Sequence, residues 1–351
     1  MIIKKQGGKM QQLQISKVKE IYGLFADETS KYIFENRLMY SMTDDSSFMR
    51  NVVYTMEEAR IIYARLKESK KKVGIFGAGV AGRYLLETFA DIQFECYIDN
   101  NCAGTMCRGL PVISLQEFKE KYFDDIVMIS SRVYYKEILA QLLEEGFHSS
   151  NIINVGEVSD RLRHLQYFDL PYLKEKKIQR EVFVDGGCFD GDTSIGFSNW
   201  CAGEGYVYAW EPDPINFKQC ERLFESNNIS YRLIPKGLWS SPKKLKLRTA
   251  GGCSTITDEE WNTVIEVDCI DRLINEPVTF IKMDIEGSEH EALLGAERMI
   301  SQHSPKLAIS IYHKPEDIWE LPWLIHKFNP TYRFYLRHYS LSWSETVLYA
   351  I

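Results

Sequence analysis

The spacing of apolar residues along the chain changes near residue 70. Before it, segments such as Lys17 to Phe25 and Met56 to Lys67 carry apolar residues three or four positions apart, which predicts helices with one buried face. The polar cluster from Ser41 to Ser47 predicts a loop or a helix start between them. After residue 70, short apolar runs alternate with amphipathic stretches, and this alternation is typical of an α/β fold with a parallel sheet.

The first α/β unit begins with the apolar run VGIF at Val73, which leads into a glycine-rich loop and a helical stretch. Gly77, Gly79 and Gly82 in this loop allow a tight turn, and the start of the helix offers N–H groups to a phosphate. A second apolar run ends at Asp99, whose carboxylate suits ribose hydroxyls. These residues predict a nucleotide or nucleotide-sugar site, and a purely structural role for the glycines is the alternative.

This first unit contains only half of a dinucleotide-binding fold. It resembles the small nucleotide-binding domains found at the front of some sugar-modifying transferases. We therefore predict a helical segment over residues 1–70, a small Rossmann-like domain over 71–156, a polar linker over 157–180 and a second domain over 181–351.

The second domain opens with the apolar run EVFVD, a glycine-rich loop, and a further run that ends in WEP. Asp185, Asp190 and Asp192 would repel a pyrophosphate, whereas a ligand with a sulfonium and an amino group would be attracted. This charge pattern favours S-adenosylmethionine over NAD. The predicted cofactor-binding residues are glycines for close backbone approach, acidic groups, and side chains near the ribose and adenine: Asp185, Gly186, Gly187, Asp190, Gly191, Thr193, Glu211, Pro212, Gly237, Trp239 and Asp284.

Two further strand ends carry candidate catalytic residues. The run VTFIKMD places Lys282, Asp284 and Glu286 at or just beyond the carboxyl end of a strand, which is the edge that holds ligands in open α/β sheets. Ser288 and Glu291 predict a capping box for the helix that follows.

The strand PKLAISIY is followed by His313, a candidate general base, and by Pro315, which suits the first turn of the next helix. Helix capping or salt bridges are the alternative roles for the charged residues among these candidates. Two strand-like runs at the end of the chain predict a terminal antiparallel hairpin.

Four segments together resemble the FkbM-type methyltransferases: VFVDGGCFDGDT, WEPDP, TFIKMDIEGSEHEALLGAE and ISIYHKP. The resemblance covers residues 181–351 and implies a class I methyltransferase sheet, S-adenosylmethionine as cofactor, and methyl transfer, usually to a hydroxyl in sugar, polyketide or polysaccharide modification. One departure is Gly187-Cys188-Phe189, where many members have a small residue and asparagine. The expected acceptor is a small molecule or a carbohydrate.

The composition of the chain excludes several classes of binding partner. The chain has 351 residues and a net charge of −7 without a basic block, so we expect no nucleic-acid substrate. No apolar run is long enough for a membrane span, and we expect a cytoplasmic protein that is compatible with a homo-oligomer. The eight cysteines lack zinc-ligand spacing, which predicts reduced thiols and no metal. An NAD-dependent oxidoreductase and a non-catalytic ligand-binding module stay open as alternatives.

Overall fold

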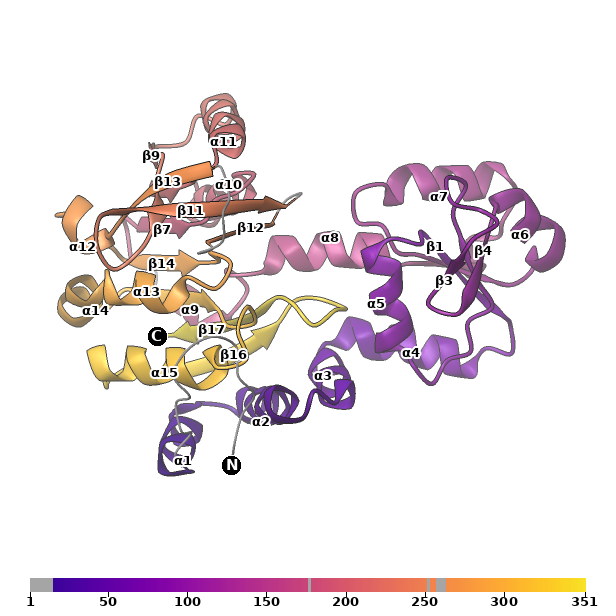
Figure 1. The fold of residues 1–351 in the computed structure, drawn as a ribbon, viewed down its shortest axis with the longest axis horizontal. Coiled ribbons are helices and arrows are strands. Elements are labelled where there is room, and N and C mark those ends of the chain that lie inside the picture. The colour runs from indigo at the N-terminus through magenta and orange to yellow at the C-terminus, as the bar shows by residue number, and fades with distance from the viewer. Residues whose placement is uncertain (1–14, 176–177, 251–252, 257–262) are drawn as a thin grey trace. The chain divides into compact units, whose positions relative to one another are not determined.

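The computed structural model describes residues 15–175, 178–250, 253–256 and 263–351. The chain divides into two compact units (Figure 1). Of the described residues, the larger unit contains 15–43 together with those in 166–337 and 346–351, and the smaller contains 44–165 and 338–345. The described part of the helical segment expected over residues 1–70 is thus shared between the two units, and residues 1–14 lie outside the described part. The hairpin segment 338–345 is grouped with the smaller unit.

The smaller unit has a six-stranded sheet of order β3-β4-β2-β1-β5-β6, in which β3 alone pairs antiparallel. Its elements follow in this order: α3 (Ser46–Val53), α4 (Glu57–Glu68), β1 (Val73–Phe76), α5 (Val80–Thr88), β2 (Cys96–Ile98), β3 (Met106–Cys107), β4 (Leu110–Ile113), α6 (Leu115–Tyr122), β5 (Ile126–Ile129), α7 (Tyr135–Glu144), the 3-10 turn Ser149–Asn151, β6 (Ile152–Asn154) and α8 (Val155–Leu165).

Both faces of this sheet are covered, because neighbouring residues of its strands point to opposite sides. Ile75 belongs to an apolar cluster with residues of α4, α5 and α8, whereas the adjacent Phe76 belongs to a second cluster with residues of α6 and α7. The strands β1 and β5 are buried at every position. Their continuous apolar runs therefore reflect burial on two faces.

The larger unit has a seven-stranded sheet of order β16-β17-β15-β14-β7-β8-β9, with β17 antiparallel to β15. Its elements are β7 (Val182–Gly186), α10 (Asp192–Trp200), β8 (Tyr206–Trp210), α11 (Pro214–Ser226), β9 (Tyr231–Ile234), β14 (Phe280–Met283), α13 (Glu289–Leu294), α14 (Glu297–His303), β15 (Lys306–Ser310), α15 (Asp317–Phe328), β16 (Phe334–His338) and β17 (Thr346–Ala350). The parallel core and terminal antiparallel strands confirm the predicted α/β fold class.

Further elements complete the larger unit. Helices α1 (Ile15–Leu24) and α2 (Glu28–Thr43) belong to it, and Ser30 at the start of α2 accepts a hydrogen bond from the backbone N–H of Leu336 at 2.8 Å. Helices α9 (Pro171–Glu175) and α12 (Ile270–Leu273) are short. A separate four-stranded sheet has the order β10-β13-β11-β12, formed by Gly237–Leu238, Thr263–Asp268, Lys243–Ala250 and Cys253–Ile256.

Two local expectations are wrong. The Ser288 side chain makes no capping hydrogen bond, so the capping box is not formed; Glu289 instead accepts a hydrogen bond from the N–H of Ile285 at 2.9 Å. The helix that was expected to begin with Pro315 begins at Asp317, and its cap residue is Glu316. Helix α13 still begins directly after Ser288, so the predicted start is right and only the capping hydrogen bond is absent.

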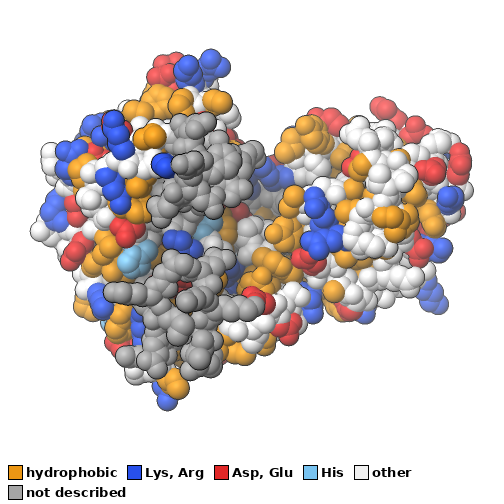
Figure 2. All heavy atoms as spheres, viewed as in Figure 1, with side chains coloured by type: hydrophobic (Ala, Val, Ile, Leu, Met, Phe, Trp, Pro, Cys, Tyr) orange, Lys and Arg blue, Asp and Glu red, His pale blue; other side chains and the backbone are white. Residues whose placement is uncertain are grey.

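The surface and the cysteines add two observations. On the face that Figure 2 shows, basic and acidic side chains are interspersed over the described atoms. Seven cysteines are free thiols, and the side chain of Cys253 lies outside the described part of the chain. Within the described ranges, every helix is too short or too polar to span a bilayer.

Candidate functional site

The loop that follows β7 is pressed against the ends of two neighbouring strands. Gly187 has a φ of 74°, and a Cβ placed on it would lie 2.2 Å from the backbone oxygen of Asp284 after β14. The N–H groups of Gly187 and Cys188 both donate to the carbonyl of Trp210 at the end of β8, each at 3.1 Å. Only glycine fits position 187, and the loop is held where the strands β7, β8 and β14 end.

A buried ion pair between Lys282 and Asp185 contacts the backbone of this loop. The Lys282 ammonium lies 2.9 Å from an oxygen of Asp185 and donates to the carbonyls of Gly186 and Gly187 at 3.2 and 2.7 Å. Ser194 donates to the other oxygen of Asp185 at 2.8 Å. Burial by itself would lower the pKa of Lys282, but the negative charges of Asp185 and Asp284 outweigh it and raise that pKa. Lys282 therefore orients the loop, and its ammonium is not exposed to an acceptor.

Glu211, directly after β8, is a buried carboxylate. One of its oxygens accepts a hydrogen bond from the N–H of Phe189 at 3.0 Å, and the other accepts from Asp213 at 2.9 Å. Burial raises the pKa of Glu211 to about 7, although the backbone hydrogen bonds act in the opposite direction. The carboxylate thus joins the glycine-rich loop to the turn before α11.

The other predicted cofactor residues come before and after Glu211 in the sequence. Asp190 accepts a long hydrogen bond of 3.3 Å from the N–H of Asp192, and Thr193 is in the first turn of α10. A Cβ placed on Gly237 would lie 3.9 Å from Pro212. Trp239 packs beside Ile265 and Val267, with the Lys243 ammonium 4.3 Å from its ring centroid.

Gly191 and Gly186 also lie where a larger side chain would meet neighbouring atoms. Gly191 has a φ of 87°, and a Cβ on it would lie 2.9 Å from the Phe224 ring. A Cβ on Gly186 would lie 2.6 Å from the end of the Leu238 side chain. Because these positions lack side chains, the backbone of the loop packs closely against its neighbours at the ends of the strands.

Asp284 is the centre of a polar cluster beside this loop. The hydroxyl of Tyr167 donates to one carboxylate oxygen at 2.9 Å, and the hydroxyl of Tyr312 donates to the other at 3.2 Å. The Nε2 atom of His313 lies 3.3 Å from the same oxygen as Tyr312. Neither tyrosine was among the predicted site residues, although Tyr312 directly precedes the predicted candidate His313 at the end of the same predicted strand.

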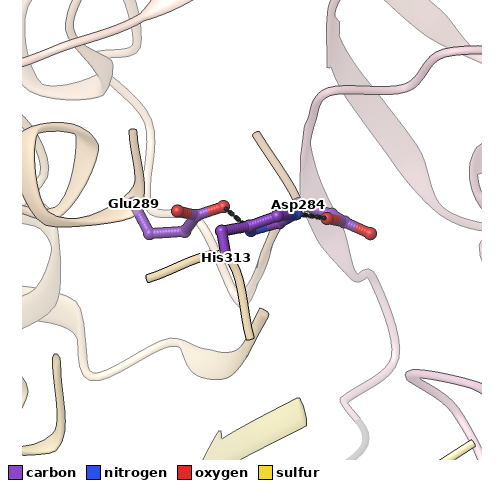
Figure 3. A group of neighbouring side chains, drawn as sticks. All are labelled: Asp284, Glu289 and His313. Carbon is purple, nitrogen blue, oxygen red and sulfur yellow. Dashed lines mark ion pairs between the residues drawn. The ribbon is translucent and has the colours of Figure 1, made fainter. Parts of the chain in front are cut away.

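His313 lies between carboxylates, as Figure 3 shows for Asp284 and Glu289. Its Nδ1 atom is 3.0 Å from Glu289 and its Nε2 atom is 3.7 Å from Glu286. Burial would lower the pKa of His313, but Glu289, Asp284 and Glu286 together raise it to about 9. Glu289 is fully buried and was missed because its position suggested only a solvent-facing residue of the first helical turn.

The glycine-rich loop of the smaller unit also forms a tight turn. Gly77 has a φ of 103°, and a Cβ on Gly82 would lie 2.1 Å from the carbonyl oxygen of Gly77. Asp99 accepts hydrogen bonds from the backbone N–H groups of Ala78 at 3.3 Å and of Asn101 at 3.0 Å. A Cβ on Gly79 would meet open space. The structure therefore brings the four predicted residues to one end of the sheet.

The order of the seven-stranded sheet and the acidic and glycine-rich strand ends define a Rossmann-like fold of the class I methyltransferase type. Comparison with family profiles then shows that residues 185–339 form a methyltransferase FkbM domain. This match confirms the resemblance found in the sequence, and the cofactor of this family is S-adenosylmethionine. Residues 69–153 match the C2185-like N-terminal family, which by itself specifies no ligand.

One similar solved structure supports the fold. The methyltransferase FkbM from Methylobacillus flagellatus KT is similar, with 23% identity, a TM-score of 0.51, and coverage of 84% of this chain and 94% of that chain. A SAM-dependent methyltransferase from Aquifex aeolicus has 15% identity and a TM-score of 0.32, and the match covers 55% of this chain and 97% of that chain. No curated protein matches the chain.

Proposed function

We propose that this protein transfers a methyl group from S-adenosylmethionine to a hydroxyl oxygen of a sugar, a glycan or a small-molecule natural product. The observation that carries the proposal is the position of Asp284. Its backbone N–H donates to the carbonyl of Gly186 at 3.1 Å, so its carboxylate lies beside the glycine-rich loop. A cofactor on the loop and an acceptor on Asp284 would be neighbours.

The residues of the loop fit the cofactor. The absence of side chains at Gly187 and Gly191 lets the loop backbone pack closely against Asp284 and Phe224, and the methionine part would bind along this backbone. Glu211 is the candidate partner of the ribose hydroxyls, and Pro212, Gly237 and Trp239 are candidates for the adenine side. When bound, S-adenosylmethionine supplies an electrophilic methyl group, and the protein contributes alignment of the acceptor oxygen with it.

The polar cluster supports a hydroxyl acceptor because a hydroxyl oxygen must lose its proton as it is methylated. The pKa of about 9 keeps His313 protonated at neutral pH, so the imidazole is poorly suited to take that proton. We assign the proton-acceptor role to Asp284, which two tyrosine hydroxyls hold in place. Glu286, whose side chain is 36% exposed, is the candidate to face the acceptor.

Methyl transfer can be tested with S-adenosylmethionine labelled in its methyl group and a panel of hydroxylated sugars, glycans and natural products. We expect Asp284→Asn to slow turnover by about 10²–10⁴-fold. Asp124→Asn, a change of the same kind at an exposed residue of the smaller unit, serves as the control. Equal turnover by Asp284→Asn and wild type would remove Asp284 from the reaction.

A second proposal concerns the smaller unit, where we infer a nucleotide or nucleotide-sugar site formed by Gly77, Gly79, Gly82 and Asp99. The supporting observation is the open space at Gly79, the cap residue of α5, where N–H groups at the helix start can approach a phosphate. Equilibrium dialysis with nucleotides and nucleotide-sugars tests it. Gly79→Asp would place a negative charge there and abolish binding, whereas retention of affinity in this variant would refute the site.

A further inference from the structure

The atoms around His313 Nε2 are spaced like the ligands of one cation. Asp284 Oδ1 lies 3.3 Å from this nitrogen and Glu286 Oε2 lies 3.7 Å from it. Two ligand atoms that each bind a divalent cation at about 2.0–2.2 Å lie about 3 Å apart when they occupy adjacent positions. Small side-chain movements would therefore bring all three atoms into contact with a single ion.

The opposite nitrogen of the ring has the partner that a metal-binding histidine usually has. Glu289 Oε1 lies 3.0 Å from His313 Nδ1, and its side chain is fully buried. A metal-bound imidazole typically donates its second N–H to a carboxylate, which fixes the orientation of the ring. An oxygen of Asp284, an oxygen of Glu289 and a ring nitrogen all lie within 4.8 Å of one another. Since Glu289 faces the far side of the ring (Figure 3), we assign it the orienting role.

The Nε2 atom of His313 points independently to a ligand. It is buried and has no hydrogen-bond partner among the described residues, and the His313 side chain is only 8% exposed. Buried polar atoms almost always have a hydrogen-bond partner, so this nitrogen requires an explanation. A cation bound to Nε2 gives that atom its partner and leaves Nδ1 to pair with Glu289.

We propose that His313 Nε2, Asp284 and Glu286 bind a divalent cation, with Glu289 as the positioning residue on Nδ1. One nitrogen and two carboxylate oxygens favour Mn²⁺ or Zn²⁺ over Mg²⁺, because imidazole is a poor ligand for Mg²⁺. Three protein ligands leave open positions for oxygen atoms of the acceptor, and a bound cation lowers the pKa of a hydroxyl.

This proposal rests on the proposed function and refines it, because the ion would replace the free Asp284 carboxylate as the group that activates the acceptor. The hydroxyl proton then leaves to water, the oxygen forms its bond to the methyl carbon, and the electron pair of the broken carbon–sulfur bond stays on sulfur.

The test is a titration of the EDTA-treated full-length protein with Mn²⁺, followed by electron paramagnetic resonance of the free ion. We expect one site per chain. Glu286→Gln removes a ligand at a partly exposed position and should weaken binding by at least about tenfold. The matched control Glu297→Gln changes an exposed residue at the start of α14 and should leave affinity unchanged.

Binding weaker than about 1 mM in the wild type, or equal affinity in Glu286→Gln and wild type, would overturn the proposal. Methyl transfer that persists in EDTA would overturn it while leaving the proposed function intact. Binding of one Mn²⁺ that Glu286→Gln weakens, in a protein that transfers no methyl group, would instead support the cation site and contradict the proposed function. Circular dichroism of each variant shows whether its fold is retained.

Discussion

The close contact between the glycine-rich loop and β14 makes Gly187→Ala a sharp test of how the site is built. A Cβ at this position would be 2.2 Å from the Asp284 carbonyl oxygen, whereas real Cβ contacts are at least 3.0 Å, so the two backbones must separate by about 0.8 Å. The left-handed backbone at φ 74° adds about 1–2 kcal/mol for any residue with a Cβ. The steric overlap adds about 1–3 kcal/mol, so we expect Gly187→Ala to lower the free energy of unfolding by about 2–5 kcal/mol in total.

Gly203→Ala separates the two contributions. Gly203 has a φ of 82°, but a Cβ on it meets nothing within 4 Å, so only the backbone cost of about 1–2 kcal/mol applies. Urea denaturation gives the free energy of unfolding of both variants, and isothermal titration calorimetry gives their affinity for S-adenosylmethionine. We expect Gly187→Ala to be the less stable variant and the only one with weakened cofactor binding. If the two variants matched in both measurements, the contact would not shape the site.

Lys282→Met should destabilise the protein by about 3–5 kcal/mol in urea denaturation, because it leaves the fully buried Asp185 without its counter-ion. Adding Asp185→Asn should restore part of this loss, and a double-mutant cycle without coupling would contradict the pairing. Glu211 has a pKa of about 7 in the folded protein, against 4.5 as its ordinary value. The folded protein thus keeps this proton at a pH where the unfolded chain has lost it, so this contribution to stability falls as pH rises from 4.5 to 7. Measured by urea denaturation, the free energy of unfolding of the wild type should fall by about 3 kcal/mol relative to that of Glu211→Gln between pH 4.5 and 7. If the stabilities of the two proteins changed with pH in the same way, the pKa of Glu211 would not be raised.

The strands and their ends could be predicted because both sheets bury their parallel strands. Runs such as VFV at 182–184 and VYAW at 207–210 are mostly apolar, and the polar residue that follows each run lies at the ligand-binding edge of the sheet. Asp185, Glu211 and Asp284 were found in this way. The family resemblance also depended on these local segments, which is why the match to residues 185–339 agrees with it.

The contacts that give these residues their environment could not be predicted from local patterns. Tyr167 reaches Asp284 across 117 positions of the chain, and the Lys282 side chain points to Asp185 across 97. Glu289 follows the rules of a helix start in sequence, but its burial against His313 depends on the position of the β15 end. The four-stranded sheet was not predicted, although Leu245 and Leu247 alternate with lysine and arginine, which is the pattern of a half-buried strand.

Calorimetric titration of S-adenosylmethionine into the purified protein shows whether the glycine-rich loop after β7 binds this cofactor. We expect one saturable site per chain, with binding abolished in Glu211→Ala and retained in the smaller-unit variant Gly79→Asp. Saturable binding of NAD with no binding of S-adenosylmethionine or S-adenosylhomocysteine would contradict it.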